Sequence, residues 1–336
     1  GLAASRWSLH TAQEELVAAL SASAIDDAVK LTLFHGRGGT VSRGGGKPRD
    51  GIMATPAGAL DGRLRVTEQG EIIFQKYGVP DSARYSLENT LASVLERTAR
   101  EHDDAQLPAA WRSAAQLIAS RSRTHYRDTV YGDPQLVAYF RLATPIDIIE
   151  RLRIGSRPPA RRGGHGIENL RAIPWVFAWN QSRLIFSGWF GLSAGLDAAV
   201  DTYGIDQLRE MAAQWPFFGN LLADTEMVLA KADMRIAARY AELAGELGAR
   251  LFPLLEQQYL RTCELLCAIN GCKELLEHDP DLQQTLRLRA PYVDPMSLMQ
   301  VDLLARWRAS GREDQQLELA LTETVRGITR AMQNAG

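Results

Sequence analysis

The sequence is poor in cysteine and has no long hydrophobic run. Its three cysteines cannot form a closed disulfide framework, which is typical of a protein in a reducing cytoplasm. The longest apolar run, around residues 172–178, is interrupted by Pro174 and is too short to span a bilayer. The first residues also lack the basic start and apolar segment of a secretory signal. We therefore expect a cytoplasmic protein with no membrane partner.

An excess of positive charge is also missing. The formal net charge is -2, so the chain has no basic footprint for a nucleic acid, and we expect no such partner. With 336 residues and 46% hydrophobic content, it can bury the core of one large or two ordinary domains.

Cys263 and Cys267 lie one helical turn apart, so a metal pair is conceivable. Because no histidine or second close pair is nearby, buried small apolar residues are the better interpretation.

Glycine, in contrast, is concentrated in one place. Six of the twelve residues from His35 to Gly46 are glycine, and they follow the apolar run Leu31–Phe34. A β-type run that leads into a glycine-rich loop brings backbone N–H groups close to an anion. Arg37 and Arg43 add permanent positive charge for phosphate or carboxylate oxygens, and His35 can move a proton near neutral pH. This run predicts a phosphorylated or polycarboxylate substrate with a proton transfer, and a flexible surface loop is the alternative.

Two standard nucleotide-binding motifs do not fit this run. A dinucleotide fingerprint that starts at Gly36 would need glycine where Val41 stands. A P-loop that ends at Lys47 would need glycine at the same position, and serine or threonine where Pro48 stands. The sequence therefore predicts an anion site of another kind.

Hydrophobic periodicity predicts a largely helical chain with a few strands. Strands are expected at Leu31–Phe34, within residues 60–76 and at Pro174–Trp179, and a mobile loop is expected at Gly155–Gly166. One helical face would carry Leu87, Leu91, Val94 and Leu95. Further helices are expected at Gln13–Leu31, Leu221–Leu247, Leu251–Ile269, Met296–Arg308 and Leu317–Met332. Early alternation of strands and helices, followed by helices alone, fits part of a parallel α/β barrel and then an α-helical domain.

The glycine-rich run also resembles the active-site segment of the phosphoenolpyruvate carboxylase family. Five further parts of the chain resemble that family in the same order: Gly62–Glu71, Gly155–Pro158 with Gly166–Trp179, Glu226–Asp233, Leu286–Arg289 with Tyr292–Pro295, and Met332–Gly336. The resemblance implies the C-terminal part of such an enzyme rather than the whole. The implied fold is α/β and predominantly α-helical. Residues 1–215 would hold the later strands of a parallel (β/α)8-type barrel, and residues 216–336 a C-terminal helical portion.

The resemblance also implies an activity for the longer protein. In that family, phosphoenolpyruvate and bicarbonate give oxaloacetate and phosphate on a divalent metal, and the enzymes are cytoplasmic tetramers. We therefore expect these substrates, Mg2+ and a homo-oligomer. The family's metal-binding residues, a catalytic histidine and a lysine would all precede Gly1, so we expect no metal site in this chain and no activity of the chain alone. The alternative is a non-catalytic regulatory module that binds a C4 dicarboxylate.

Catalytic and substrate-binding roles follow from the resemblance residue by residue. His35 matches the family's base for the carboxyphosphate proton, and a purely structural histidine is the alternative. Arg37 and Arg43 match arginines at the substrate. The remaining substrate-binding matches are Gln69, Arg157, Arg171, Arg161 and Arg162. The last two lie on a segment that is either a lid over the site or a solvated charge run.

The resemblance implies a regulatory site as well. The residues that match those holding the inhibitor aspartate or malate are Arg43, Lys231, Arg289 and Asn334. Cations with an amide donor are suited to two carboxylates. Ser42, Ala160 and His165 depart from the family pattern.

Overall fold

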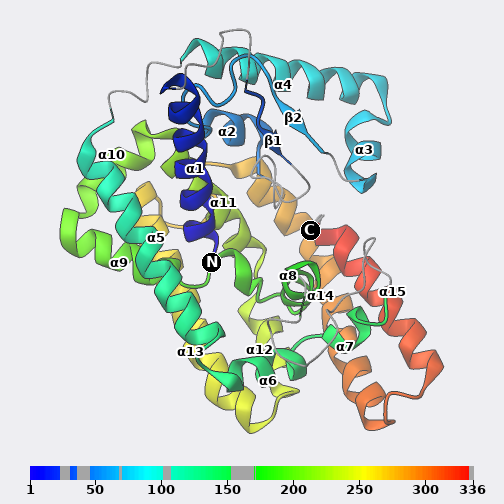
Figure 1. Ribbon diagram of the computed structural model, residues 1–336. Helices are drawn as coiled ribbons and strands as arrows, with labels where there is room; N and C mark the ends of the chain where they lie inside the picture. The colour runs from blue at the N-terminus through cyan, green and yellow to red at the C-terminus, as the bar shows by residue number, and fades with distance from the viewer. Residues whose placement is uncertain are drawn as a thin grey trace.

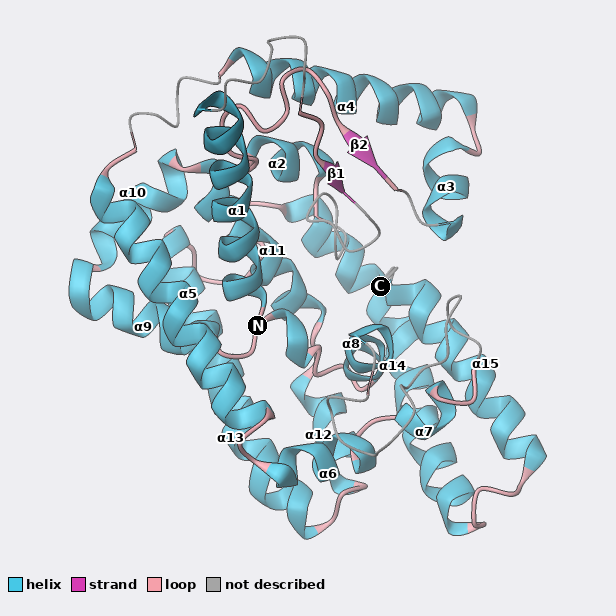
Figure 2. Cartoon of the chain, viewed as in Figure 1, coloured by secondary structure: helices cyan, strands magenta, loops and turns pink. Residues whose placement is uncertain are grey.

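The computed structural model describes residues 1–22, 31–35, 46–67, 70–100, 107–152, 170 and 172–332, and helices dominate them (Figures 1 and 2). The helices of the first half are α1 (Leu2–Ala22), α2 (Pro48–Met53), α3 (Gly70–Tyr77), α4 (Pro80–Ala99), α5 (Ala109–Val130), α6 (Pro134–Leu142) and α7 (Ile146–Ile149). Those of the second half are α8 (Ala172–Gln181), the short 3-10 helix η4 (Phe186–Gly188), α9 (Leu192–Tyr203), α10 (Ile205–Gln214), α11 (Pro216–Lys231), α12 (Met234–Glu242), α13 (Glu246–Asn270), α14 (Pro280–Ala309) and α15 (Gln315–Met332).

Two short strands pair in parallel within the described residues. Strand β1 (Phe34–His35) lies beside β2 (Arg65–Val66), with Phe34 opposite Arg65 and His35 opposite Val66. The Arg65 guanidinium lies 5.3 Å from the centre of the Phe34 ring, a cation–π contact across the pair. The expected strand before the glycine-rich run is thus confirmed at its last residue and at His35. Figure 2 shows both strands below α4, with α2 beside them.

One expected strand is wrong and another is confirmed only in part, because the structure has helices there. Pro174–Trp179 lies inside α8. Within residues 60–76 the strand is confirmed at Arg65–Val66, whereas Ile72–Phe74 lies inside α3. Pro174 falls in the first turn of α8, where a missing N–H removes no helical hydrogen bond. A buried helix is apolar on several sides, so its short sequence cannot be distinguished from a buried strand by periodicity.

The long helix expected at Leu221–Leu247 is divided in the structure. Helix α11 ends at Lys231, and Asp233 caps α12 by accepting hydrogen bonds from the main-chain N–H groups of Arg235 (3.0 Å) and Ile236 (3.1 Å). An N-cap aspartate adopts an extended backbone, so it interrupts one helix and starts the next. Helices are confirmed at Leu251–Ile269, Met296–Arg308 and Leu317–Met332. The first helix begins earlier than expected, at Leu2, and residues 23–30 lie outside the described part.

The main hydrophobic core joins the first helix to the second half of the chain. Trp179 and Phe186 stack at 4.9 Å between ring centres, and Phe186 stacks on Phe190 at 4.2 Å. Helix α1 inserts Trp7 against Trp215 and the ring of Phe217, at 6.0 and 5.6 Å. Buried aromatic rings supply much of the apolar area that stabilises a core. These contacts fix α1 against the start of α11, the helix that carries Lys231.

One expected apolar face remains open. Helix α4 buries Val94, but the side chains of Leu87, Leu91 and Leu95 are 58%, 61% and 59% exposed. Figure 1 shows α4 along the outer edge of the molecule, above α2 and the strands. No helix in the described ranges combines the length and apolar character needed to cross a membrane.

Candidate functional site

The structure describes only some of the residues that the sequence singled out. Lys231 and Arg289 are described with their side chains, and His35 by its main chain in β1. The other candidates lie outside the described residues: Arg37, Arg43, Gln69, Arg157, Arg161, Arg162, Arg171 and Asn334, with Ser42, Ala160 and His165. Their roles stay predictions. What the structure adds is the framework on both sides of these segments.

The last glycine of the glycine-rich run lies against a buried carboxylate. A β-carbon at Gly46 would lie 2.2 Å from Oδ1 of Asp224 on α11, so any larger residue would displace one of the two. Asp224 cannot swing aside freely, because Oδ2 forms an ion pair with the Arg6 guanidinium of α1, and both side chains are buried. Asn220 also donates to Oδ2 at 3.5 Å. The end of the glycine-rich run is therefore held on α11.

The next residue connects the run to α14. Lys47 Nζ lies 2.7 Å from Asp279 Oδ2, and Asp279 is also the N-cap of α14, accepting from the Leu282 N–H at 3.2 Å. This hydrogen bond with Asp279 raises the pKa of Lys47 above its ordinary value. Because Lys47 is exposed, the ion pair contributes little to the free energy of folding. Its effect is to fix Lys47 beside the N-terminus of α14. Residues 46–47 thus contact the two helices that carry Lys231 and Arg289.

Lys231 is a buried cation beside a second cation. It is the last residue of α11 and is 7% exposed. Burial and, to a smaller extent, the positive charge of Arg289 lower its pKa to about 8, while Asp224 opposes the shift. Two like charges held together in a poorly solvated place favour the binding of an anion, because an anion offsets both the repulsion and the desolvation.

Carboxylates also contribute to the charge around Lys231. Burial raises the pKa of Asp224, against the opposing charge and hydrogen bond of Arg6, and Asp50 raises it further. Arg6 pairs directly with Asp224, and the charge of Asp224 also favours the protonated form of Lys231. Among Arg6, Lys231, Arg289, Asp224 and Asp50 the three cations outnumber the two carboxylates, and this surplus of positive charge suits an anion.

A second connection fixes the end of α11 against α14. The Asp233 N–H donates to the Arg183 carbonyl at 3.0 Å, and Arg183 Nη1 donates to Asp294 Oδ1 of α14 at 2.7 Å. Arg183 has a φ of 61°, in the left-handed region that a non-glycine residue rarely adopts, and Ile185 has a φ of 47°. Such backbone persists only where the surroundings enforce it. The turn after α8 therefore sets the spacing between Lys231 and Arg289.

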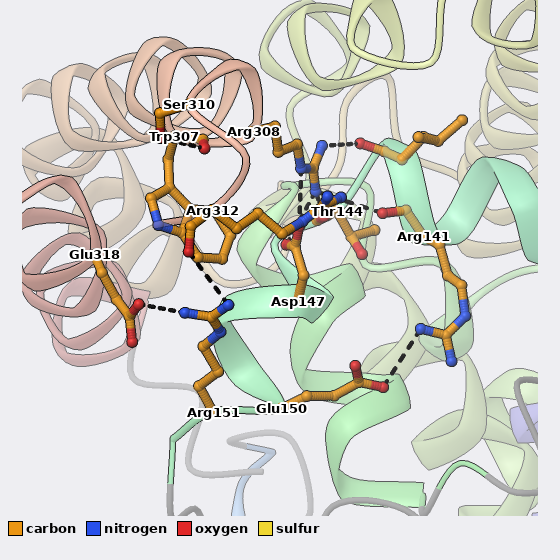
Figure 3. Close-up of polar contacts among 11 residues, drawn as sticks. Arg141, Thr144, Asp147, Glu150, Arg151, Trp307, Arg308, Ser310, Arg312 and Glu318 are labelled. Carbon is orange, nitrogen blue, oxygen red and sulfur yellow. Dashed lines mark hydrogen bonds and ion pairs between the residues drawn. The ribbon is translucent and has the colours of Figure 1, made fainter. Parts of the chain in front are cut away.

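A third framework lies where the arginine-rich segment 153–169 joins the described chain. Arg308 of α14 binds both carboxylate oxygens of Asp147 in α7, Nε to Oδ2 at 2.9 Å and Nη2 to Oδ1 at 3.1 Å, as Figure 3 shows. Arg308 also donates to the carbonyl of Thr144 at 2.7 Å, and Arg312 donates to Asp147 at 3.2 Å. Arg151 pairs with Glu318 of α15. Residues 147–151, in and just after α7, thus contact both α14 and α15. Helix α14 carries Arg289, and α15 ends just before residues 333–336.

The described residues do not offer a metal site. No three histidine, cysteine, aspartate or glutamate side chains come together there in a way that could hold a metal ion. The donor set therefore does not fit Mg2+ within this part of the chain, and we derive no step through a metal.

The three cysteines are free, and each is only half-buried rather than buried as expected.

Sequence reasoning missed the residues that form the framework. Gly46 is the last residue of the glycine-rich run, but its contact with Asp224 depends on how α11 packs against that run. Asp224 lies two residues before the matching segment Glu226–Asp233, and Arg6 lies in a helix with no matching motif. Asp147 and Arg308 look like ordinary surface charges in the sequence. No local pattern marks a pair of residues that meet only in the folded chain.

Comparison with known proteins gives a consistent result. The family model described as phosphoenolpyruvate carboxylase matches residues 1–336. A phosphoenolpyruvate carboxylase of Xanthomonas oryzae pv. oryzae (strain MAFF 311018) is 49% identical over 337 residues, which cover 100% of this chain and 37% of the relative. The similarly named protein of Alcanivorax borkumensis is 42% identical over 340 residues, 38% of its length, and that of Nitrosomonas eutropha 40% identical over 345 residues, 36% of its length. The chain thus spans little more than a third of the relatives that it matches.

Proposed function

The chain belongs to the phosphoenolpyruvate carboxylase family, and on this basis we propose that it is the C-terminal part of an enzyme that converts phosphoenolpyruvate and bicarbonate to oxaloacetate and phosphate. In this proposal, residues 1–215 supply the later strands of a parallel barrel and residues 216–336 a helical portion. The parallel pairing of β1 with β2 supports the barrel. The longer protein is proposed to be a cytoplasmic homo-oligomer.

One observation carries the proposal. The end of the glycine-rich run lies on α11 at Asp224 and on the N-cap of α14 at Asp279. The same two helices carry Lys231 and Arg289, which belong to other segments that resemble the family. Segments far apart in the sequence are therefore neighbours in the fold, as one anion site requires.

The chemistry proposed for this chain is anion binding with a proton transfer. His35 ends β1, and the ends of parallel barrel strands are where catalytic residues lie. We assign His35 to take the proton of carboxyphosphate, so that the carbon dioxide released can react with the enolate of pyruvate. Arg37, Arg43, Gln69, Arg157 and Arg171 are assigned to hold the phosphate and enolate charge.

Two further assignments concern water and metal. Arg161 and Arg162 are proposed to cover the site, because exclusion of water protects the enolate from protonation. Mg2+, with ligands supplied by the part of the longer protein that this chain does not contain, would stabilise the enolate and phosphate charge. This chain alone is therefore proposed to be inactive.

Regulation by a C4 dicarboxylate is assigned to the cationic cluster. Lys231 and Arg289, together with Arg43 and Asn334, would hold the two carboxylates of aspartate or malate. The position of Lys231 supports this assignment, because it lies buried near the charge of Arg289 and neighbouring cations attract the two carboxylates of one ligand.

A second candidate function follows from the same cluster. Lys231 and Arg289 lie together within this chain, so a regulatory module that binds dicarboxylates without catalysis is the alternative. The two functions differ in what the longer protein does.

The experiment that separates them measures oxaloacetate through malate dehydrogenase and NADH oxidation. The longer protein and this chain are each supplied with phosphoenolpyruvate, bicarbonate and Mg2+. We expect turnover by the longer protein and none by the chain. Turnover by neither, with aspartate binding retained, would favour the regulatory module.

A further inference from the structure

The end of α13 carries two cysteines in a fixed relationship. Gly271 caps the helix in the left-handed conformation, with φ 68° and ψ 29°. The Cys272 N–H then donates to the Cys267 carbonyl at 3.0 Å, five residues back. This is a Schellman motif, which places the side chains of the two bonded residues in contact. In most proteins that contact is apolar, whereas here it joins two thiols.

The two thiols are close enough to react. Both cysteines are free and half-buried, and each thiol influences the pKa of the other, so the two side chains lie near each other. A main-chain hydrogen bond between two residues holds their Cα atoms at a separation of the order that a disulfide spans, ~4.4–6.8 Å. Cys263 lies one turn earlier on α13, where Tyr259 influences the pKa of its thiol.

We propose that Cys267 and Cys272 are a redox modification site, which closes to a reversible disulfide by exchange with a small-molecule disulfide. One thiolate attacks the small disulfide, forms a mixed disulfide and releases one small thiol. The second cysteine attacks the mixed disulfide, forms the Cys267–Cys272 bond and releases the second small thiol. The two protons of the protein thiols end on the two released thiols, so the protein loses two electrons and the small disulfide gains them.

Geometry favours the disulfide, while the surroundings make its formation slow. Burial raises the pKa of both thiols, that of Cys272 to about 12. The charges that face the pair are Glu226 of α11 and Glu277 of the loop after α13, and both raise the thiol pKa further. Thiolate is therefore scarce at neutral pH, and the rate of exchange rises with pH. The pair responds to sustained oxidising conditions rather than to brief ones.

The bond would stiffen a loop that contacts the anion-site framework. Asn270 donates to Glu226 Oε2 at 3.1 Å, and the Leu276 N–H donates to Glu226 Oε1 at 2.7 Å. Glu226 lies on α11, the helix that ends at Lys231, and the loop ends at Asp279, the partner of Lys47. The disulfide therefore closes one end of the loop that joins α13 to α14 and contacts α11 through Glu226.

The test counts thiols after incubation of the folded chain in glutathione buffers of increasing oxidised fraction at pH 8. Samples are quenched with acid, alkylated and digested with trypsin, which yields Thr262–Lys273 with all three cysteines in one peptide. Cys263→Ser, Cys267→Ser and Cys272→Ser identify the pair. We expect wild type and Cys263→Ser each to lose two thiols without a glutathione adduct, and the other two variants to form no internal disulfide.

A second measurement tests whether the folded arrangement of Cys267 and Cys272, rather than the reactivity of the thiols alone, favours the disulfide. The oxidised-to-reduced ratio at a fixed glutathione buffer is expected to be about tenfold higher in the folded chain than in urea, because the motif holds the thiols together. Three free thiols in the folded chain throughout, a stable glutathione adduct, or closure that requires Cys263 would overturn the proposal. Equal ratios in the folded and unfolded chain would overturn it as well.

Discussion

The main chain of Gly46 is in contact with the carboxylate of Asp224, so closely that a β-carbon at position 46 would lie 2.2 Å from Oδ1. Arg6 holds that carboxylate from the other side. The end of the glycine-rich run is thereby fixed to α11 by a residue whose only useful property is its missing side chain. If the run binds substrate, the contact sets where its arginines can reach.

We predict that Gly46→Ala in the longer protein lowers kcat/KM about tenfold or more, because small displacements of binding groups have large effects on rate. Steady-state kinetics with phosphoenolpyruvate measures this. Gly204→Ala is the matched control, because Gly204 has a φ of 82° and a β-carbon there would meet nothing within 4 Å. That variant should lose stability and keep kcat/KM. Equal losses of activity in both variants would contradict the positioning role of Gly46.

Dicarboxylate binding should depend on the charge of Lys231. Burial and Arg289 lower its pKa to about 8, so the ammonium is present below about pH 8 and is lost above it. Affinity for aspartate or malate is therefore expected to be full at pH 7 and to fall as pH rises through 8. Titration calorimetry from pH 6.5 to 9.5 measures this. Lys231→Ala should remove most binding at pH 7, and Lys231→Arg should flatten the pH dependence.

The lowered pKa of Lys231 affects the stability of the unbound protein in the opposite direction: stability rises with pH, whereas dicarboxylate affinity falls. The unfolded chain keeps the Lys231 proton up to its ordinary pKa of 10.5, while the folded chain loses it near 8. Between these values the folded state binds fewer protons, so the contribution of Lys231 to stability rises with pH. A dicarboxylate affinity that stays constant between pH 7 and 9.5 would contradict the role of Lys231.

Asp147 should be important for stability. It accepts hydrogen bonds from Arg308 and Arg312, and both Asp147 and Arg308 are largely buried. We predict that Asp147→Ala lowers the free energy of unfolding by about 2–3 kcal/mol, because a charged partner is left with fewer hydrogen bonds. Urea denaturation measures this. Asp302→Ala is the control: it breaks an exposed pair with Arg306 and should cost no more than about 0.5 kcal/mol. Similar losses in both variants would contradict the assignment.

The exposed leucines of α4 should make the isolated chain associate. Leu87, Leu91 and Leu95 are more than half exposed and lie one helical turn apart. Contiguous apolar surface of this kind is usually covered in the native assembly. We predict that Leu91→Lys raises the monomer fraction in sedimentation velocity, whereas Leu319→Lys, at a single exposed leucine of α15, does not. A purely monomeric wild type would contradict this.

The sequence predicted the elements whose signals are local and missed those set by packing. The helices at Leu251–Ile269 and Leu317–Met332 have long amphipathic patterns, so periodicity found them. Pro174–Trp179 was mistaken for a strand because a short buried helix has no polar face. Lys231 and Arg289 were found by resemblance, and the structure brings their charges together. The contacts of Gly46 and Asp147 depend on residues more than a hundred positions away, which no local pattern encodes.

The most direct test of the central proposal is to measure oxaloacetate and phosphate together, in the longer protein and in its His35→Asn variant. Phosphate transfer to bicarbonate precedes the proton transfer assigned to His35, so the variant is expected to lose oxaloacetate formation and to keep at least part of its phosphate release. The unaltered protein should release both products in equal amounts. Equal loss of the two products in the variant would contradict the role of His35. An absence of oxaloacetate from the unaltered protein would contradict the proposed function itself.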